Sequence, residues 1–374
     1  MPALTINNHH NVYILGAGFS ATHGLPLIKD FMLALRDAHP WLLEQGRKLE
    51  ADAVERVLQY RLDSAPASYR ISLDLENIEE LFSLADAGKD VLSRHIRIAI
   101  AATLDYKMVG SELPVTTFTS EDPGILPGAW HVNQRSTINF RVPTYQFFAW
   151  TLLGRWSDPL ASSAFLTFNY DCVLEDALKD IGYDIDYGLR SVANKLFSST
   201  DGNLGVGTIR VLKLHGSVNW MRKSRSASLQ VVPAYSDVIK VAGVPEIVPP
   251  TWRKLFAKEV VDVWKTALEE IERATRIVII GFSMPPNDLH FKFLLASGLR
   301  RNVSLREIVF VDPAGQAITD RAHELFGDLE RRPPVRVIQA RIARFVNVGM
   351  LPETVSSIDR RIPESIASLQ HSVF

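Results

Sequence analysis

Five short apolar runs, separated by helical patterns, constrain the fold of this chain most strongly. The runs are Asn11–Leu15, Ala164–Phe168, Arg210–Leu214, Arg276–Ile280 and Glu307–Val311, and a last one is predicted at Val335–Gln339. The periodicity between them predicts helices over Cys172–Ile181, Ala257–Ala274 and His290–Leu299. Alternating strands and amphipathic helices bury both faces of a parallel sheet. The pattern therefore predicts an α/β fold, doubly wound around a mainly parallel sheet.

A long helical stretch interrupts this alternation after the first strand and its helix. Apolar residues at three- and four-residue spacing predict helices at Asp30–Ala38, Ala51–Leu62, Ile78–Ala85 and Val91–Leu104. Residues 110–143 are rich in Pro, Thr, Gly and Asn and predict loops or short irregular pairs, before a helix at Tyr145–Leu153. We expect a core of residues 11–30 and 145–345, a mostly helical insertion of residues 31–144, and a C-terminal extension of residues 346–374.

Charge and cysteine content exclude several classes of protein. Lys and Arg number 41 against 42 Asp and Glu, so no net field draws the molecule to a nucleic acid or an anionic membrane. No run approaches the ~18 apolar residues of a membrane span, and we expect a cytoplasmic protein. The single cysteine, Cys172, excludes intrachain disulfides and a multi-cysteine zinc site. No histidine spacing predicts a metal site, and His9 and His10 are expected in a solvated tail.

The turn after the first strand carries a glycine-rich pattern. It reads Gly16-Ala17-Gly18-Phe19-Ser20, and ligands of parallel sheets bind beyond the carboxyl ends of strands. Glycines here would allow a pyrophosphate close to the N–H groups of the helix that follows. An ordinary strand-to-helix turn is the alternative. The pattern does not favour a dehydrogenase, because no second strand brings an acidic residue about 20 residues later.

Polar residues also follow the later strands. Asn169 and Asp171 follow one strand and His215 another, while Gly281 and Ser283 follow Arg276–Ile280 and Asp312 follows Glu307–Val311. Each has a structural alternative as well: Asn169 or Asp171 could cap the next helix, His215 could be a hydrogen-bonded structural histidine, and the others could form turns.

Together and in this order, these strand ends resemble the sirtuin-like family, whose NAD pocket combines a GAG-x-S turn, an N-x-D strand end, an HG strand end and a late G-x-S turn. The resemblance covers about residues 11–30 and 145–315 and implies a Rossmann-like core. The bacterial antiphage-defence branch is the most similar, as indicated by the strings Thr167–Asp171, Lys213–Trp220, Ile247–Trp252 and Asn77–Glu80. Members of that branch hydrolyse NAD during phage infection, often as oligomers alongside a second defence protein.

The resemblance implies roles for individual residues and makes NAD the substrate, cleaved to nicotinamide and ADP-ribose. Asn169 would hold a ribose hydroxyl or the attacking water, since an amide both donates and accepts. His215 would act as the base. The residues implied for nucleotide binding are Gly16, Ala17, Gly18, Phe19, Ser20, Asp171, Gly281 and Ser283, with Asp312 expected at the adenosine ribose.

Two alternatives to an NAD hydrolase stay open from the sequence. A deacylase of this family needs a zinc module of four cysteines, which one cysteine cannot form, so no zinc is expected. A module that senses NAD or ADP-ribose without turnover would use the same pocket. The resemblance further implies a homo-oligomer and a second defence protein, such as a helicase-type or nucleotide-hydrolysing ATPase. Because free NAD destruction is toxic, we expect the insertion to control the site.

Overall fold

The main sheet of this computed structural model has eight strands in the order β13-β12-β11-β1-β4-β7-β5-β6. The structure describes residues 10–87, 92–120, 138–153, 162–189, 196–197, 207–223, 228–251, 258–284, 288–326, 334–342 and 345. Paired strands of the sheet run parallel, except that β6 is antiparallel to β5. The strands are β1 (His10–Leu15), β4 (Ser162–Thr167), β5 (Tyr183–Asp186), β6 (Leu196–Phe197), β7 (Gly207–Lys213), β11 (Arg276–Ile280), β12 (Glu307–Val311) and β13 (Val335–Ile338).

Strand β1 lies in the middle of this sheet and defines where a ligand can bind. Its last four residues are all buried, and β4, β11 and β12 show the same continuous burial. Such runs form where helices cover both faces of a parallel sheet. The chain builds β4, β5 and β7 on one side of β1 and β11, β12 and β13 on the other. The order of strands therefore reverses at β1, which is where open α/β sheets form a binding crevice.

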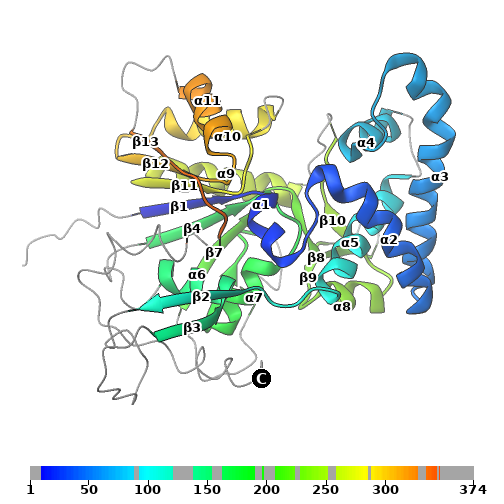
Figure 1. The fold of residues 1–374 in the computed structure, drawn as a ribbon, viewed down its shortest axis with the longest axis horizontal. Coiled ribbons are helices and arrows are strands. Elements are labelled where there is room, and N and C mark those ends of the chain that lie inside the picture. The colour runs from blue at the N-terminus through cyan, green and yellow to red at the C-terminus, as the bar shows by residue number, and fades with distance from the viewer. Residues whose placement is uncertain are drawn as a thin grey trace, which may run out of the picture.

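Helices cover both faces of the main sheet (Figure 1). On one face, α7 (Val173–Asp180) packs against α6 (Thr144–Leu153) and β5. On the other, α9 (Lys258–Arg273) packs against α10 (Leu289–Leu299), β7 and β1. The helix α11 (Gly315–Phe326) contacts β13. The predicted doubly wound α/β fold is therefore confirmed.

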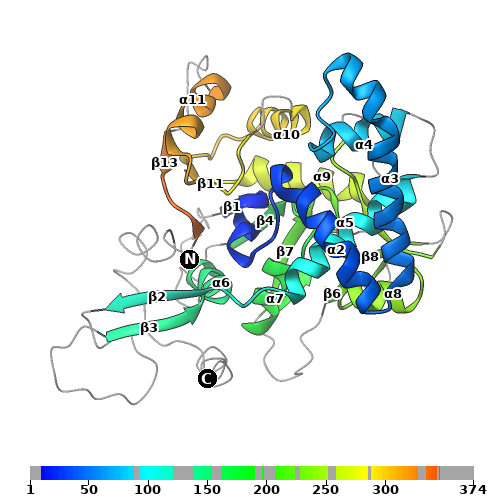
Figure 2. The same cartoon turned by 45° about the vertical axis from the view of Figure 1, so that its right-hand side comes forward.

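A second group of elements lies beside the main sheet in both Figure 1 and Figure 2. It contains the helices of the predicted insertion, α2 (Phe31–Glu44), α3 (Lys48–Ile71), α4 (Ile78–Ala87) and α5 (Leu92–Val109). A small antiparallel sheet joins them, built from β8 (Gly216–Arg222), β9 (Gln230–Val231) and β10 (Val244–Ile247), with α8 (Tyr235–Lys240) against it. Strand β10 contacts α5. The strands β2 (Val115–Ser120) and β3 (Ile138–Pro143) form a separate antiparallel pair.

The predicted helix start after the glycine turn is present as α1 (Ala17–Ser20), which has four residues and passes into the 3-10 turn η1 (Ala21–His23). One local prediction at the start of the chain was wrong. His10 is not in a solvated tail: it begins β1, with Nδ1 2.7 Å from Ser162 Oγ and Nε2 2.7 Å from Glu270 Oε2. His9 and residues 346–374 lie outside the described residues.

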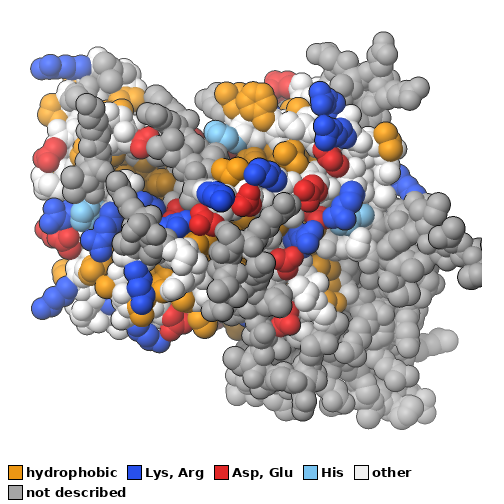
Figure 3. Space-filling model, turned by 180° about the vertical axis from the view of Figure 1, so that it is seen from behind, with side chains coloured by type: hydrophobic (Ala, Val, Ile, Leu, Met, Phe, Trp, Pro, Cys, Tyr) orange, Lys and Arg blue, Asp and Glu red, His pale blue; other side chains and the backbone are white. Residues whose placement is uncertain are grey.

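Surface charge is mixed rather than segregated on the face seen in Figure 3, where acidic and basic side chains alternate. Within the described part of the chain, no helix is long and apolar enough to cross a bilayer.

Candidate functional site

A cavity of about 870 Å³ lies at the carboxyl edge of the main sheet and reaches the helical insertion. Its lining comes from the turns or loops after β1, β4, β7, β11 and β12, and from the start of α4. The structure therefore brings together nine of the predicted site residues: Ala17, Gly18, Ser20, Asn169, Asp171, His215, Gly281, Ser283 and Asp312.

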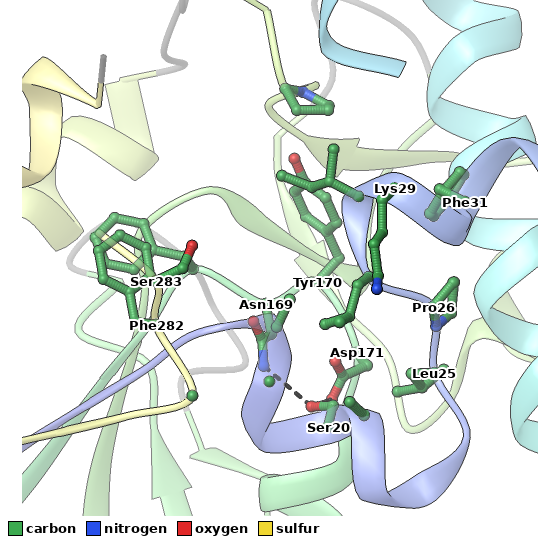
Figure 4. A pocket seen from close by; sticks show the side chains of 18 of the residues that line it. Ser20, Leu25, Pro26, Lys29, Phe31, Asn169, Tyr170, Asp171, Phe282 and Ser283 are labelled. Carbon is green, nitrogen blue, oxygen red and sulfur yellow. Dashed lines mark hydrogen bonds between the residues drawn. The ribbon is translucent and has the colours of Figure 1, made fainter. Parts of the chain in front are cut away.

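Asn169 is fixed by two hydrogen bonds from its amide nitrogen. Nδ2 donates to the carbonyl oxygen of Gly16 at 2.9 Å and to Ser20 Oγ at 3.0 Å. Because a backbone carbonyl can only accept, the amide must present its nitrogen to Gly16, which settles its orientation. Figure 4 shows the amide oxygen on the side away from Ser20. Asn169 thus offers a ligand an acceptor and no donor.

Asp171 joins the hydrogen-bond network of Asn169 through Ser20. Its Oδ1 accepts from Ser20 Oγ at 3.1 Å and from the backbone N–H of Val173, also at 3.1 Å. Burial of the carboxyl, together with the nearby Glu175, raises the pKa of Asp171, although Lys213 opposes the rise. Asp171 therefore binds the start of α7, as the capping alternative predicted, and also orders Ser20 under the cavity.

His215 lies two residues after the end of β7 and is surrounded by aromatic side chains. Its ring centroid is 5.2 Å from that of Phe168, 6.3 Å from that of Tyr170 and 6.5 Å from that of Trp264. The side chain is buried yet lines the cavity. Gly216, next in the chain, has φ +78°, and a Cβ there would lie 2.1 Å from the carbonyl oxygen of Glu246. Glycine is required because the chain turns sharply from the main sheet into β8.

The glycines of the first turn have a structural role, in agreement with the alternative of a strand-to-helix turn. Gly18 N–H donates to Gly281 O at 2.8 Å, Gly16 N–H to Ile280 O at 3.0 Å, and Phe19 N–H to Gly16 O at 2.9 Å. A Cβ on Gly16 or Gly18 would lie within 3 Å of the Gly281 carbonyl oxygen. These three N–H groups are therefore occupied, which corrects the expectation that they are free for a pyrophosphate.

Of the predicted residues Phe19, Asp312 and Ser283, the first lies in the core and the other two line the cavity. The Phe19 side chain does not line the cavity but packs in the core, 5.0 Å from the ring of Tyr145. Asp312 lines the cavity while its Oδ1 accepts from Ala314 N at 2.8 Å, as a turn residue does. Ser283 is exposed at the cavity, across from Asn169 in Figure 4.

Residues before and inside the insertion also line the cavity, and sequence reasoning assigned them no role in the site. Asn77 and Glu79 contribute from the start of α4, and Lys29 and Leu25 from the segment before α2. Figure 4 shows the Lys29 ammonium on the same side of the cavity as Pro26 and Leu25. The string Asn77–Glu80 was the available signal, since it belongs to the resemblance but matches no strand end.

A buried histidine makes the first turn sensitive to acid. Burial lowers the pKa of His23, which follows the cavity residue Thr22. The unfolded chain therefore binds a proton near pH 6.5 while the folded chain does so only at lower pH. The stability from this histidine is present above about pH 6.5 and declines as the pH falls below it. Urea unfolding between pH 7.5 and 5.5 should show this loss, and a His23→Gln variant with an equally steep decline would contradict it.

The fold and the cavity define an α/β protein with a ligand site at the switch point of its sheet. Comparison with known families then identifies part of the chain: residues 163–328 match the model of the SIR2-like domain. The match runs from β4 through α11 and includes Asn169, Asp171, His215 and Gly281. Residues 163–328 are therefore similar to a SIR2-like domain, which confirms the resemblance over this part of the chain; the branch within the family stays a prediction.

Several solved Sir2 structures are similar to this chain. Sir2Tm bound to a propionylated peptide has 14% identity and a TM-score of 0.38, with 90% of each chain covered. A structure concerned with the mechanism and regulation of Sir2 enzymes has 14% identity and a TM-score of 0.41, with 97% of this chain and 94% of that chain covered. A complex of Sir2 with a p53 peptide and NAD+ has 14% identity and a TM-score of 0.35, with 90% of each chain covered. No curated protein matches the sequence.

Proposed function

We propose that this chain binds NAD in the cavity and hydrolyses the bond between nicotinamide and ribose. The observation that carries the proposal is the meeting of Asn169 and His215 in one cavity, with the Asn169 amide held so that its oxygen is left for a ligand. An acceptor and a proton-accepting imidazole are the groups that attack by water or a ribose hydroxyl requires. The SIR2-like domain match supports NAD as the nucleotide.

Departure of nicotinamide needs little help from an acid catalyst, because nicotinamide leaves NAD as a neutral molecule. The ribose–nitrogen bond breaks with its electron pair going to the ring nitrogen, and positive charge develops on the ribose. Asn169 Oδ1 accepts a hydrogen bond from a ribose hydroxyl or from the attacking water, and its partial negative charge favours the developing cation. Water forms the new bond to the anomeric carbon, and its proton passes to His215.

An aromatic wall suits the flat rings of the substrate. Phe168 and Phe282 both line the cavity, and their rings stack with centroids 4.9 Å apart and an interplanar angle of 17°. Aromatic faces attract cations and stack with flat rings. Because several N–H groups of the first turn are occupied and the Ser20 hydroxyl already donates to Asp171, we assign phosphate contacts to Thr22 and the Lys29 ammonium, both of which line the cavity.

Chromatography of NAD incubated with the purified protein tests the proposal. We expect nicotinamide and ADP-ribose in equal amounts, at the same rate with and without a chelator, since the proposed leaving group needs no Lewis acid. Intact NAD together with measurable binding would favour the sensor. Faster loss of acyl groups from lysine peptides than of NAD, abolished by the chelator, would favour a deacylase.

We also propose that the enzyme serves as a bacterial antiphage effector whose insertion controls the site. The start of α4 lines the cavity through Asn77 and Glu79, so a shift of this helix changes the cavity wall. The adjacent Glu76 accepts hydrogen bonds from Arg36 of α2 and Arg61 of α3, which ties the wall to the rest of the insertion. A trigger would need to favour one of two states that differ by a few kcal/mol.

Control by assembly predicts that specific activity rises steeply with protein concentration or on adding a partner. The measurement is NAD hydrolysis across a dilution series, with mass followed by light scattering. A monomer with full, concentration-independent activity would rule out assembly as the control.

A further inference from the structure

A buried ion pair contacts the loop that carries Asn169. Lys213, on β7, is fully buried, and its Nζ lies 2.8 Å from Oε1 of the buried Glu175 on α7. The same ammonium donates to the backbone carbonyl of Asp171. Taking two charges out of water costs free energy, so a fully buried pair is weak evidence for a role in stability alone.

The pair joins the two loops that the proposed reaction needs. Lys213 stands two residues before His215 in the chain, and Asp171 two residues after Asn169. Two backbone hydrogen bonds join the same two segments: Leu214 N–H donates to Thr167 O at 2.9 Å, and Val218 N–H donates to Tyr170 O at 3.0 Å. Lys213 adds a third, charged donor to these two backbone bonds, and hydrogen bonds to charged groups are the stronger ones.

The bond to Asp171 also acts on Asn169 through its hydrogen bonds. The carboxyl of Asp171 orders Ser20, and Ser20 Oγ accepts from the Asn169 amide. Displacing the backbone at Asp171 therefore displaces the groups that hold the Asn169 oxygen in the cavity. A misplacement of about 1 Å at a reacting group can cost about a hundredfold in rate.

We propose that the Lys213–Glu175 pair is a positioning device that fixes the Asn169 loop to the strand leading into His215. This inference rests on the proposed function, because it assigns the pair to the geometry of that reaction. Neither residue lines the cavity, so both act through Asn169 and His215 rather than on the substrate.

The double variant Lys213→Met/Glu175→Leu tests the proposal. Removing Lys213 alone would leave Glu175 buried without its cation, whereas apolar replacement of both partners is often tolerated. We expect a folded protein whose kcat for NAD is lowered about tenfold to a hundredfold, with KM within about threefold of the wild-type value, because the residues that line the cavity are unchanged. The matched control is Arg276→Gln/Glu307→Gln, which removes an ion pair at the amino ends of β11 and β12 and should retain wild-type kcat.

Hydrogen exchange provides a readout that needs no substrate. In the double variant, amides of residues 168–173 and 214–218 should exchange faster than in the wild-type protein, while the control variant leaves both segments unchanged. A double variant with wild-type kcat and wild-type exchange would overturn the positioning role, as would an equal loss of kcat in the control. If the wild-type protein does not cleave NAD, the proposed function fails and the exchange measurement alone decides the positioning role.

Discussion

Replacing Asn169 or His215 with alanine is expected to lower the turnover of NAD by about two orders of magnitude or more, as the loss of a general base does. The reason for Asn169 is that its amide oxygen is the acceptor that the Gly16 and Ser20 contacts leave for a ligand. The two residues act on one bond, so the double variant should lose far less than the product of the two single effects. Initial rates at saturating NAD measure this.

Folding and binding must be measured alongside these rates. Each variant should retain the unfolding midpoint of the wild-type protein and bind ADP-ribose. His95→Ala is the matched control, because His95 lies in α5 and does not line the cavity. Wild-type turnover in His215→Ala would remove His215 as the base, and fully multiplicative losses would show that the two residues contribute independently rather than as a unit.

Gly281→Ala is expected to lower the free energy of unfolding by about 2–5 kcal/mol, because a left-handed conformation and a steric clash add together. Gly281 has φ +59°, and a Cβ there would lie 2.2 Å from the backbone nitrogen of Phe19. The variant would force apart the turns after β1 and β11, which carry Gly18 and Ser283. We therefore expect ADP-ribose binding to weaken as well.

Gly46 offers a control that separates the two causes. It has φ +70°, and a Cβ there would have no atom within 4 Å, so Gly46→Ala carries the conformational cost without the clash. We expect that variant to lose about 1 kcal/mol and to retain ADP-ribose binding. Urea unfolding of both variants measures the difference, and equal losses would refute the role assigned to the contact between the turns.

Six of the eight strands of the main sheet were predictable because they are short apolar runs bounded by turns, whereas β5 and β6 were missed. Strand β11 has the predicted bounds, Arg276–Ile280, and β12 likewise, Glu307–Val311. The candidate site followed from the same pattern, since the rule on strand ends led to Asn169 and His215, which line one cavity. Chain order and residue type alone were sufficient there.

The small antiparallel sheet was missed for a physical reason. Six of the seven residues of β8 are buried, including the polar Ser217 and Asn219, so the strand lacks the alternation that marks a sheet with one solvent face. Strand β10 has only four residues. Local periodicity therefore gives no signal for β8 or β10, and contacts with α5 and α8 stabilise the small sheet.

Contacts between distant segments account for what the sequence could not indicate at the site. From the sequence, the N–H group of Gly18 was predicted to be available to a phosphate. In the structure it donates to Gly281, which follows β11. In the sequence, Lys213 is a single polar residue within an apolar strand, and its partner Glu175 lies 38 positions earlier in the chain. No pattern along the chain links either pair, because tertiary packing alone brings them together.

Blocking the cavity tests most directly whether NAD is cleaved there. Ala17 is exposed and lines the cavity, so Ala17→Trp should fill the space while leaving the core and the residues Asn169 and His215 unchanged. The measurement is nicotinamide release from NAD by the wild-type protein and by Ala17→Trp, with equal unfolding midpoints as the control for folding. We expect steady release by the wild-type protein and at least tenfold less by the variant, because the substrate is excluded from its site. Release at the wild-type rate from Ala17→Trp, or none from the wild-type protein while it binds NAD, would contradict cleavage in the cavity.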